Sequence, residues 1–205
     1  MSLLLSPDIT RHATTVDARR GLELILRDGT PAVLRPLGDG EAGPLEAVFA
    51  GMSAASRASR YLVGLPRLPA SFRRALTAVD GQRHVAWVAE IGSRPAGIAR
   101  FIRLPEDEGS AEFAFEVVDE HHGRGLAGVL LHVVAAVAVA HGVTTLRASL
   151  SPDNVASRRL VTRYGARVHL VDGLLEAEGP LTLPAPAPVD DALVLDVHAE
   201  HRGRR

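Results

Sequence analysis

One glycine-rich segment of this sequence has the composition of an anion-binding turn. It runs His122-Gly123-Arg124-Gly125-Leu126-Ala127-Gly128, between a β-type run and a long apolar run with helical spacing. In such a turn, backbone N–H groups and the dipole of the following helix converge, and the glycines leave room for a phosphate. Arg124 adds a positive charge. The segment predicts a site for a phosphate-bearing ligand, although a glycine-rich turn without a ligand would show the same pattern.

Two carboxylates lie just before this segment, on a run that alternates like a β-strand. Glu112 and Glu116 share one face of that run, and four residues of strand rise separate them by about 13 Å. A partly buried carboxylate can take a proton from an amine that must act as a nucleophile. At that separation the two groups cannot both serve one reacting atom. Each is a candidate base, and the alternative is that both are ordinary solvated residues.

Three other kinds of chemistry find less support. The adjacent His121 and His122 lack further ligands at metal-binding spacing, so no metal site is expected. Residues 123–128 also fit the G-x-G-x-x-G pattern of dinucleotide-binding domains, but the next strand-like run, 144–150, lacks the acidic residue that would bind the ribose. The chain has no cysteine and cannot form a cysteine acyl-thioester. Any acyl transfer should therefore pass directly from donor to acceptor.

The elements that must position these residues alternate between strands and helices. The patterns predict strands at 22–26, 32–34, 85–91, 97–104, 111–118 and 144–150, helices at 44–52, 70–79 and from 126 onward, a further helix between 154 and 165, and closing strands. This order predicts an α/β (α+β) domain with a mixed, mostly antiparallel central sheet flanked by helices. One β-α-β crossover would carry the glycine-rich segment.

The chain divides into three parts. Residues 1–20 lack periodicity and are expected to form a flexible leader, and 21–183 form one domain. Residues 184–205 begin as a proline-rich spacer and continue as a possible last strand and a basic tail. With 205 residues and 46% hydrophobic content, the chain can bury one sizeable core.

Charge and hydropathy argue against several partners. A formal charge of -1, from 23 basic and 24 acidic residues, provides no field that would hold nucleic acid or an anionic membrane. The apolar stretch 126–140 is interrupted by His132 and is shorter than the roughly 18 residues of a membrane span. The N-terminal apolar run is too short for a signal peptide. We expect a cytoplasmic protein with no nucleic-acid or membrane partner.

The glycine-rich segment also resembles a known family. His122-x-x-Gly125-x-Ala127 is similar to the pyrophosphate loop of the GNAT superfamily of N-acetyltransferases, in which Gln or Arg usually stands at the position of His122. Asn154-x-x-Ser157 resembles the start of the later helix that flanks the coenzyme in that family. These motifs occur in the family's order along the chain.

A narrower resemblance covers roughly residues 22–180. Four segments look like the acyltransferase domain of bacterial Pat-type protein lysine acetyltransferases: Arg27-Asp28-Gly29-Thr30, Leu34-Arg35-Pro36, Ser59-Arg60-Tyr61-Leu62 and 80–89. The resemblance implies acetyl-CoA as the acyl donor, without a metal. It also implies an amine acceptor, either a protein lysine or a small molecule, and leaves a non-catalytic acyl-CoA-binding sensor as the alternative.

The resemblance assigns roles to individual residues. It implies that Glu112 is the general base in preference to Glu116, and that backbone N–H groups between Glu116 and Val118 meet the thioester carbonyl. No general acid is assigned, because Val161 stands where many relatives have a tyrosine and Tyr164 is expected to be a packing residue. The implied coenzyme contacts are Val117, Val118, His122, Gly123, Arg124, Gly125, Leu126, Ala127, Gly128, Asn154 and Ser157.

Overall fold

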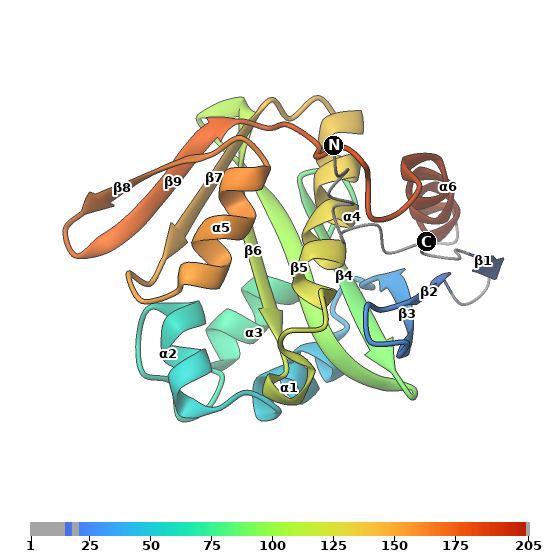
Figure 1. Cartoon of the computed structure of the whole chain (residues 1–205), viewed down its shortest axis with the longest axis horizontal. Helices are drawn as coiled ribbons and strands as arrows, with labels where there is room; N and C mark the ends of the chain where they lie inside the picture. The colour runs from blue at the N-terminus through green and yellow to red at the C-terminus, as the bar shows by residue number, and fades with distance from the viewer. Residues whose placement is uncertain (1–14, 18–20, 204–205) are drawn as a thin grey trace, which may run out of the picture.

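A nine-stranded sheet is the framework of the molecule (Figure 1). The computed structural model describes residues 15–17 and 21–203. The strands are β1 (Thr15–Asp17), β2 (Gly21–Ile25), β3 (Pro31–Pro36), β4 (His84–Ile91), β5 (Arg94–Leu104), β6 (Asp107–Val117), β7 (Thr145–Leu150), β8 (Arg167–Val171) and β9 (Leu174–Pro180). Their order in the sheet is β1-β2-β3-β4-β5-β6-β7-β9-β8. Only the β6–β7 pair is parallel among these strands, so the predicted mixed, mostly antiparallel sheet with one β-α-β crossover is confirmed.

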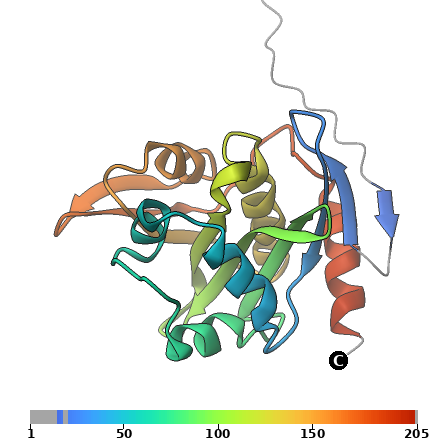
Figure 2. The same ribbon diagram turned by 90° about the horizontal axis from the view of Figure 1, so that it is seen from below.

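Helices cover both faces of the sheet. They are α1 (Ala42–Ala50), α2 (Ala54–Tyr61), α3 (Ala70–Thr77), α4 (Leu126–Ala140), α5 (Val155–Arg163) and α6 (Asp191–Arg202), with a 3-10 turn at Asp119–His121. The helices α4, α5 and α6 contribute to the larger apolar core, whereas α1 packs over a smaller core on the opposite face. Figure 2 shows α1 and α2 on the side of the sheet away from α4. None of the described helices is long and apolar enough to cross a membrane.

The alternation of β6 separates its polar and apolar side chains. Ala111, Phe113 and Val117 belong to the core that α4 covers. Successive side chains of a strand point to opposite faces, so Glu112 and Glu116 lie on the face that carries α1, α2 and α3. The sequence pattern of β6 thus places both carboxylates on the side opposite to the helix that begins at the glycine-rich loop.

The C-terminal segment corrects one expectation. Residues 184–205 were expected to hold a possible last strand and a basic tail, but α6 stands there instead. Asp190 caps its first turn by accepting the N–H of Ala192 at 2.8 Å. Val194, Val197 and His198 are buried against the sheet and α4. Helical spacing of these residues, not strand alternation, fits the apolar surface that α4 and β3 leave open.

Two further segments differ from the expectations. The helix α2, at the Ser59-Arg60-Tyr61-Leu62 segment, was not predicted, because its apolar residues are mostly alanines and none of its residues is buried. The strand β1 lies inside the expected leader 1–20 and pairs with β2. The remainder of that leader, residues 1–14 and 18–20, lies outside the described residues.

Candidate active site

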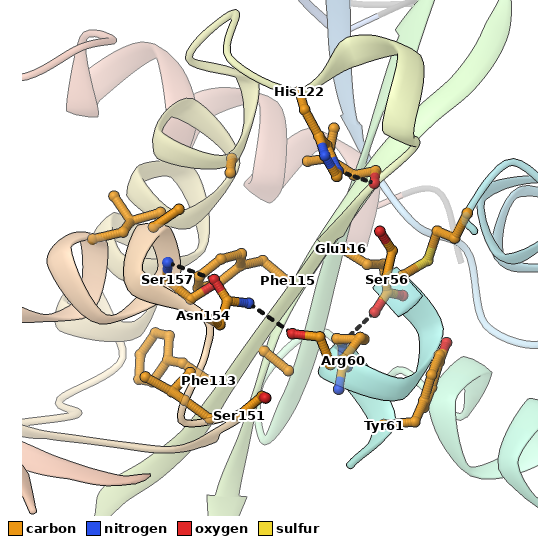
Figure 3. Close-up of a pocket in the computed structure, with 18 of the residues that line it drawn as sticks. Ser56, Arg60, Tyr61, Phe113, Phe115, Glu116, His122, Ser151, Asn154 and Ser157 are labelled. Atoms are coloured by element: carbon orange, nitrogen blue, oxygen red, sulfur yellow. Dashed lines mark hydrogen bonds and ion pairs between the residues drawn. The ribbon is translucent and has the colours of Figure 1, made fainter. Parts of the chain in front are cut away.

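The two strands at the centre of the site diverge. β6 and β7 pair at three positions of β6, Ser110, Ala111 and Glu112. Beyond this point β6 continues to Val117 beside β5, and β7 continues to Leu150 beside β9. A cavity of about 1270 Å³ opens there and is lined by both strands, the loop after β6, α2 and α5 (Figure 3). The cavity therefore reaches from one face of the sheet to the other.

Backbone N–H groups of β6 point into this gap. Val118 donates its N–H to the Ala96 carbonyl at 2.9 Å, which directs that group toward β5. Because N–H directions alternate along an antiparallel strand, the N–H of Glu116 also faces β5, and those of Phe115 and Val117 face the side from which β7 has diverged. The sequence expectation counted Glu116 and Val118 among the donors to a thioester carbonyl. The register favours Phe115 and Val117 instead.

The loop between β6 and α4 supplies further donors. Gly123 and Gly125 have φ angles of +77° and +86°, a region that glycine adopts without steric cost. Gly125 is the N-cap of α4, so the N–H groups of Leu126 and Ala127 lack partners within the helix, whereas Gly128 donates to the Gly125 carbonyl at 3.0 Å. Loop residues that line the cavity are His122, Gly123, Gly125, Leu126, Ala127 and Gly128. Free N–H groups, a helix N-terminus and small residues together suit a phosphate.

The side chains of this loop have separate attachments. His122 places its Nε2 2.9 Å from the carbonyl oxygen of Val117, which ties the loop to the end of β6. Arg124 forms an ion pair with Asp28 at 3.3 Å and donates a hydrogen bond to Thr30 Oγ1 at 3.2 Å. Arg124 is also absent from the cavity lining. Arg124 was expected to contact a phosphate, but in this structure its guanidinium contacts the β2–β3 turn.

A different arginine faces the cavity. Arg27 lines it from the β2–β3 turn, and a Cβ built at Gly125 would lie 3.3 Å from its Nε. Sequence reasoning assigned Arg27 no role, because it stands almost 100 positions before the loop, as the numbering shows. The close approach to Gly125 makes Arg27 the cation nearest to the start of α4 that the cavity contains.

The start of α5 forms the opposite wall. Asn154 caps this helix, since its Oδ1 accepts the N–H of Ser157 at 2.9 Å. Its Nδ2 donates to Ser59 Oγ at 3.0 Å, so the cap also joins α5 to α2 across the cavity (Figure 3). Asn154 and Ser157 both line the cavity, together with Ser59. Tyr164 is buried and donates weakly to the Gly128 carbonyl at 3.4 Å, as a packing residue would.

The two candidate bases have different surroundings. Glu116 is almost fully buried, and its two oxygens meet Arg60 and Arg100, the latter at 3.2 Å. Glu112 is exposed at the cavity wall and forms no hydrogen bond or ion pair to any described residue. Each oxygen of the Glu116 carboxylate is already paired with a guanidinium, whereas the Glu112 carboxylate has no such partner among the described residues. Glu116 therefore has a structural role between two arginines, and Glu112 is the carboxylate that a ligand in the cavity can contact.

Apolar side chains line the part of the cavity under α2. Tyr61, Leu62, Phe72 and Leu76 line this part, and the Tyr61 and Phe72 rings lie 6.4 Å apart. Burial raises the pKa of the Tyr61 hydroxyl, which has no hydrogen-bond partner in the described chain. These apolar side chains and the carboxylate of Glu112 therefore line the same cavity.

Metal chemistry has no visible basis in the described part of the chain. Among residues 15–17 and 21–203, no three His, Cys, Asp or Glu side chains are grouped so that they could hold a metal ion. His121 lies 3.3 Å from Glu120, and His122 contacts Val117.

Comparison with known proteins identifies the family. Residues 32–167 match the family model described as "Acetyltransferase (GNAT) domain". The chain belongs to the GNAT acetyltransferase family. The chain is accordingly an acyl-CoA-dependent N-acyltransferase, and acetyl-CoA is the donor that GNAT enzymes use.

Individual relatives support a similarity to Pat-type enzymes. Acetyltransferase Pat of Mycolicibacterium smegmatis is 36% identical over 93 residues, which are 44% of this chain and 28% of that protein. A solved structure of the GNAT domain of S. lividans PAT matches with a TM-score of 0.71 and 30% identity, covering 78% of this chain and 96% of that one. The chain therefore spans under a third of the matched Pat protein and nearly all of the isolated GNAT domain.

A third relative is named for a small diamino acid. L-2,4-diaminobutyric acid acetyltransferase of Streptomyces coelicolor is 36% identical over 95 residues, 42% of this chain and 56% of that protein. The common ground of these relatives is transfer of an acetyl group to an amine.

Proposed function

We propose that this GNAT enzyme acetylates the ε-amine of protein lysines, with Glu112 as the general base. The observation that carries the proposal is the position of Glu112, which is exposed in the wall of a cavity that apolar side chains also line. A lysine side chain has an apolar stem and a terminal amine, so it can contact both the apolar side chains and the carboxylate that line this cavity. The similarity to Acetyltransferase Pat supports the same acceptor class.

The reaction needs a neutral amine. A lysine amine has an ordinary pKa of about 10.4, so deprotonation near pH 7 costs roughly 4 to 5 kcal/mol. Glu112 takes this proton, directly or through a water molecule, as the nitrogen attacks the thioester carbonyl. The carbon–nitrogen bond forms, the carbon–sulfur bond breaks, and the thiolate of coenzyme A leaves.

Backbone groups of β6 assist the attack. N–H groups of Phe115 and Val117 point into the gap between β6 and β7 and can donate to the carbonyl oxygen while it gains negative charge. The first turn of α4 and the side chain of Arg27 hold the phosphates at the other end of the cavity. Because Phe115 and Val117 belong to the strand that carries Glu112, donor and acceptor are positioned by one element.

An assay with a broad acceptor panel tests the proposal. Purified enzyme and acetyl-CoA are combined with small amines, lysine peptides and a deacetylated lysate proteome, and acetyl-lysine is measured by mass spectrometry. We expect site-specific acetylation of protein lysines that the Glu112→Gln variant lacks. If only small amines are acetylated, the acceptor is a small molecule and not a protein lysine. Coenzyme binding without turnover of any amine would support the acyl-CoA-binding sensor instead.

A further inference from the structure

Arg60 is a partly exposed cation in the wall of the cavity that also contains Glu112. It lies on α2, lines the cavity, and keeps 18% of its side chain exposed. Its Nε pairs with Glu116, which also pairs with Arg100. The two terminal nitrogens of Arg60 make no hydrogen bond to any residue within the described ranges. Figure 3 shows Arg60 beside Tyr61 at the cavity wall. Part of its guanidinium is therefore available to a ligand.

The charges around Arg60 are unevenly matched. Two guanidiniums, of Arg60 and Arg100, share the single buried carboxylate of Glu116. Burial opposes the charge of Arg60, but Glu116, Tyr61 and Glu112 raise its pKa. With Glu112 included, these four charged groups sum to zero. A protonated amine that approaches Glu112 would leave this group of four side chains with one positive charge in excess.

A carboxylate on the acceptor would restore the balance. The terminal nitrogens of a guanidinium form strong, directional hydrogen bonds to a carboxylate. We propose that Arg60 binds a carboxylate carried by the acceptor, so that the enzyme selects amines with an acidic group close by. This inference rests on the proposed amine acetylation. The carboxylate can belong to a free diamino acid or to an acidic residue beside the target lysine.

Matched acceptor pairs test the inference in the unmodified enzyme. Lysine is compared with 1,5-diaminopentane, 2,4-diaminobutyrate with 1,3-diaminopropane, and a lysine peptide with a neighbouring aspartate with the same peptide carrying asparagine. Within each pair only the carboxylate differs. We expect at least one carboxylate-bearing member to have a kcat/KM about tenfold or more above its partner's, and the pair in which this occurs identifies the source.

The outcomes separate this inference from the function on which it rests. Turnover of both members of every pair at equal kcat/KM would overturn the role of Arg60 and leave amine acetylation intact. If no amine is turned over, both proposals fail. A preference for the neutral members would also contradict the charge argument.

Variants of α2 then assign the preference to Arg60. Arg60→Gln should reduce the preference at least tenfold, through a higher acceptor KM, and leave the affinity for acetyl-CoA unchanged. Arg60→Lys should retain part of it, since it keeps the charge. Arg57→Gln is the matched control, because Arg57 anchors the same helix through carbonyls of Phe49, Ala50 and Pro66 and does not line the cavity. Equal loss in the Arg57 variant would mean that displacement of α2, rather than the charge of Arg60, sets the preference.

Discussion

At the scale of single residues, Glu112 and Glu116 are chemically identical and differ only in surroundings. Glu112→Gln keeps the side-chain shape and removes the proton acceptor, so kcat/KM at neutral pH should fall by about 10² to 10⁴. The loss should shrink at high pH, where the amine loses its proton without help. Steady-state rates from pH 7 to 10 measure this effect. The affinity for acetyl-CoA should stay unchanged, because the phosphates bind elsewhere.

Glu116→Gln should show the opposite pattern. Removing one partner of a buried ion pair costs about 3 to 5 kcal/mol, and here Arg60 and Arg100 both lose their partner. The free energy of unfolding, measured in urea, should fall by that amount, whereas Glu112→Gln should change it little. A stable but inactive Glu116 variant beside an active Glu112 variant would show that the base is at the other end of the strand.

The sequence predicted that Glu112 and Glu116 lie on one face of β6, but not which side chains surround each of them. Alternation along β6 placed both glutamates on one face, and this is local information. The partners of Glu116 come from α2 and β5, at sequence separations of 56 and 16 residues. No pattern within β6 indicates that two arginines would converge on one carboxylate and not on the other. The contacts of Arg124 could not be predicted for the same reason, because Asp28 and Thr30 approach it only in the folded chain.

At the scale of elements, the loop before α4 depends on backbone conformation. Gly125 has φ +86°, and an added Cβ would meet Arg27. A non-glycine residue in this region costs about 1 to 2 kcal/mol, so Gly125→Ala should weaken acetyl-CoA binding about tenfold in calorimetry. Gly142→Ala is the control, since Gly142 has φ +84° with no atom within 4 Å of its Cβ position and lies outside the cavity. Equal weakening in both variants would contradict a local role for the loop.

Elements were predictable where apolar spacing was strong. The helix α4 and the strands of the central sheet have continuous or alternating apolar runs, and both appear as expected. The helix α2 lacks such a run and is attached by polar contacts of Ser59 and Arg60. For α6 a signal was present, since Asp190 precedes apolar residues at helical spacing. The proline-rich spacer before it instead favoured the interpretation of this segment as extended chain and a last strand.

At the scale of the whole molecule, the absence of cysteine has a kinetic consequence. Without a thiol in its 205 residues, the chain should transfer the acetyl group within a complex of both substrates. Initial-rate plots should therefore intersect, as sequential kinetics require. Intact-mass measurement after incubation with acetyl-CoA alone should show no stable adduct. Parallel initial-rate lines together with a trapped acetyl-enzyme would contradict direct transfer.

Buried histidines should make the stability of the whole fold depend on pH. His198 on α6 donates its Nε2–H to the carbonyl oxygen of Gly81 at 3.0 Å, and its ring stacks on Trp87. His84 starts β4 at the same turn and is also buried. Burial, as the main cause, lowers the pKa of each to about 4. Both rings are thus neutral in the folded state above that pH.

The sign of the effect follows from comparison with the unfolded chain, in which a histidine has a pKa of about 6.5. The stabilisation is fully present above pH 6.5 and is lost as the pH falls toward 4, because only the unfolded state gains the protons. Between pH 7 and 5 each of the two histidines should lower the free energy of unfolding by about 2 kcal/mol. Urea unfolding at both pH values measures the loss, and His198→Gln should reduce it by about 2 kcal/mol, the contribution of that histidine. An equal pH-dependent loss in that variant would show that His198 does not carry this dependence.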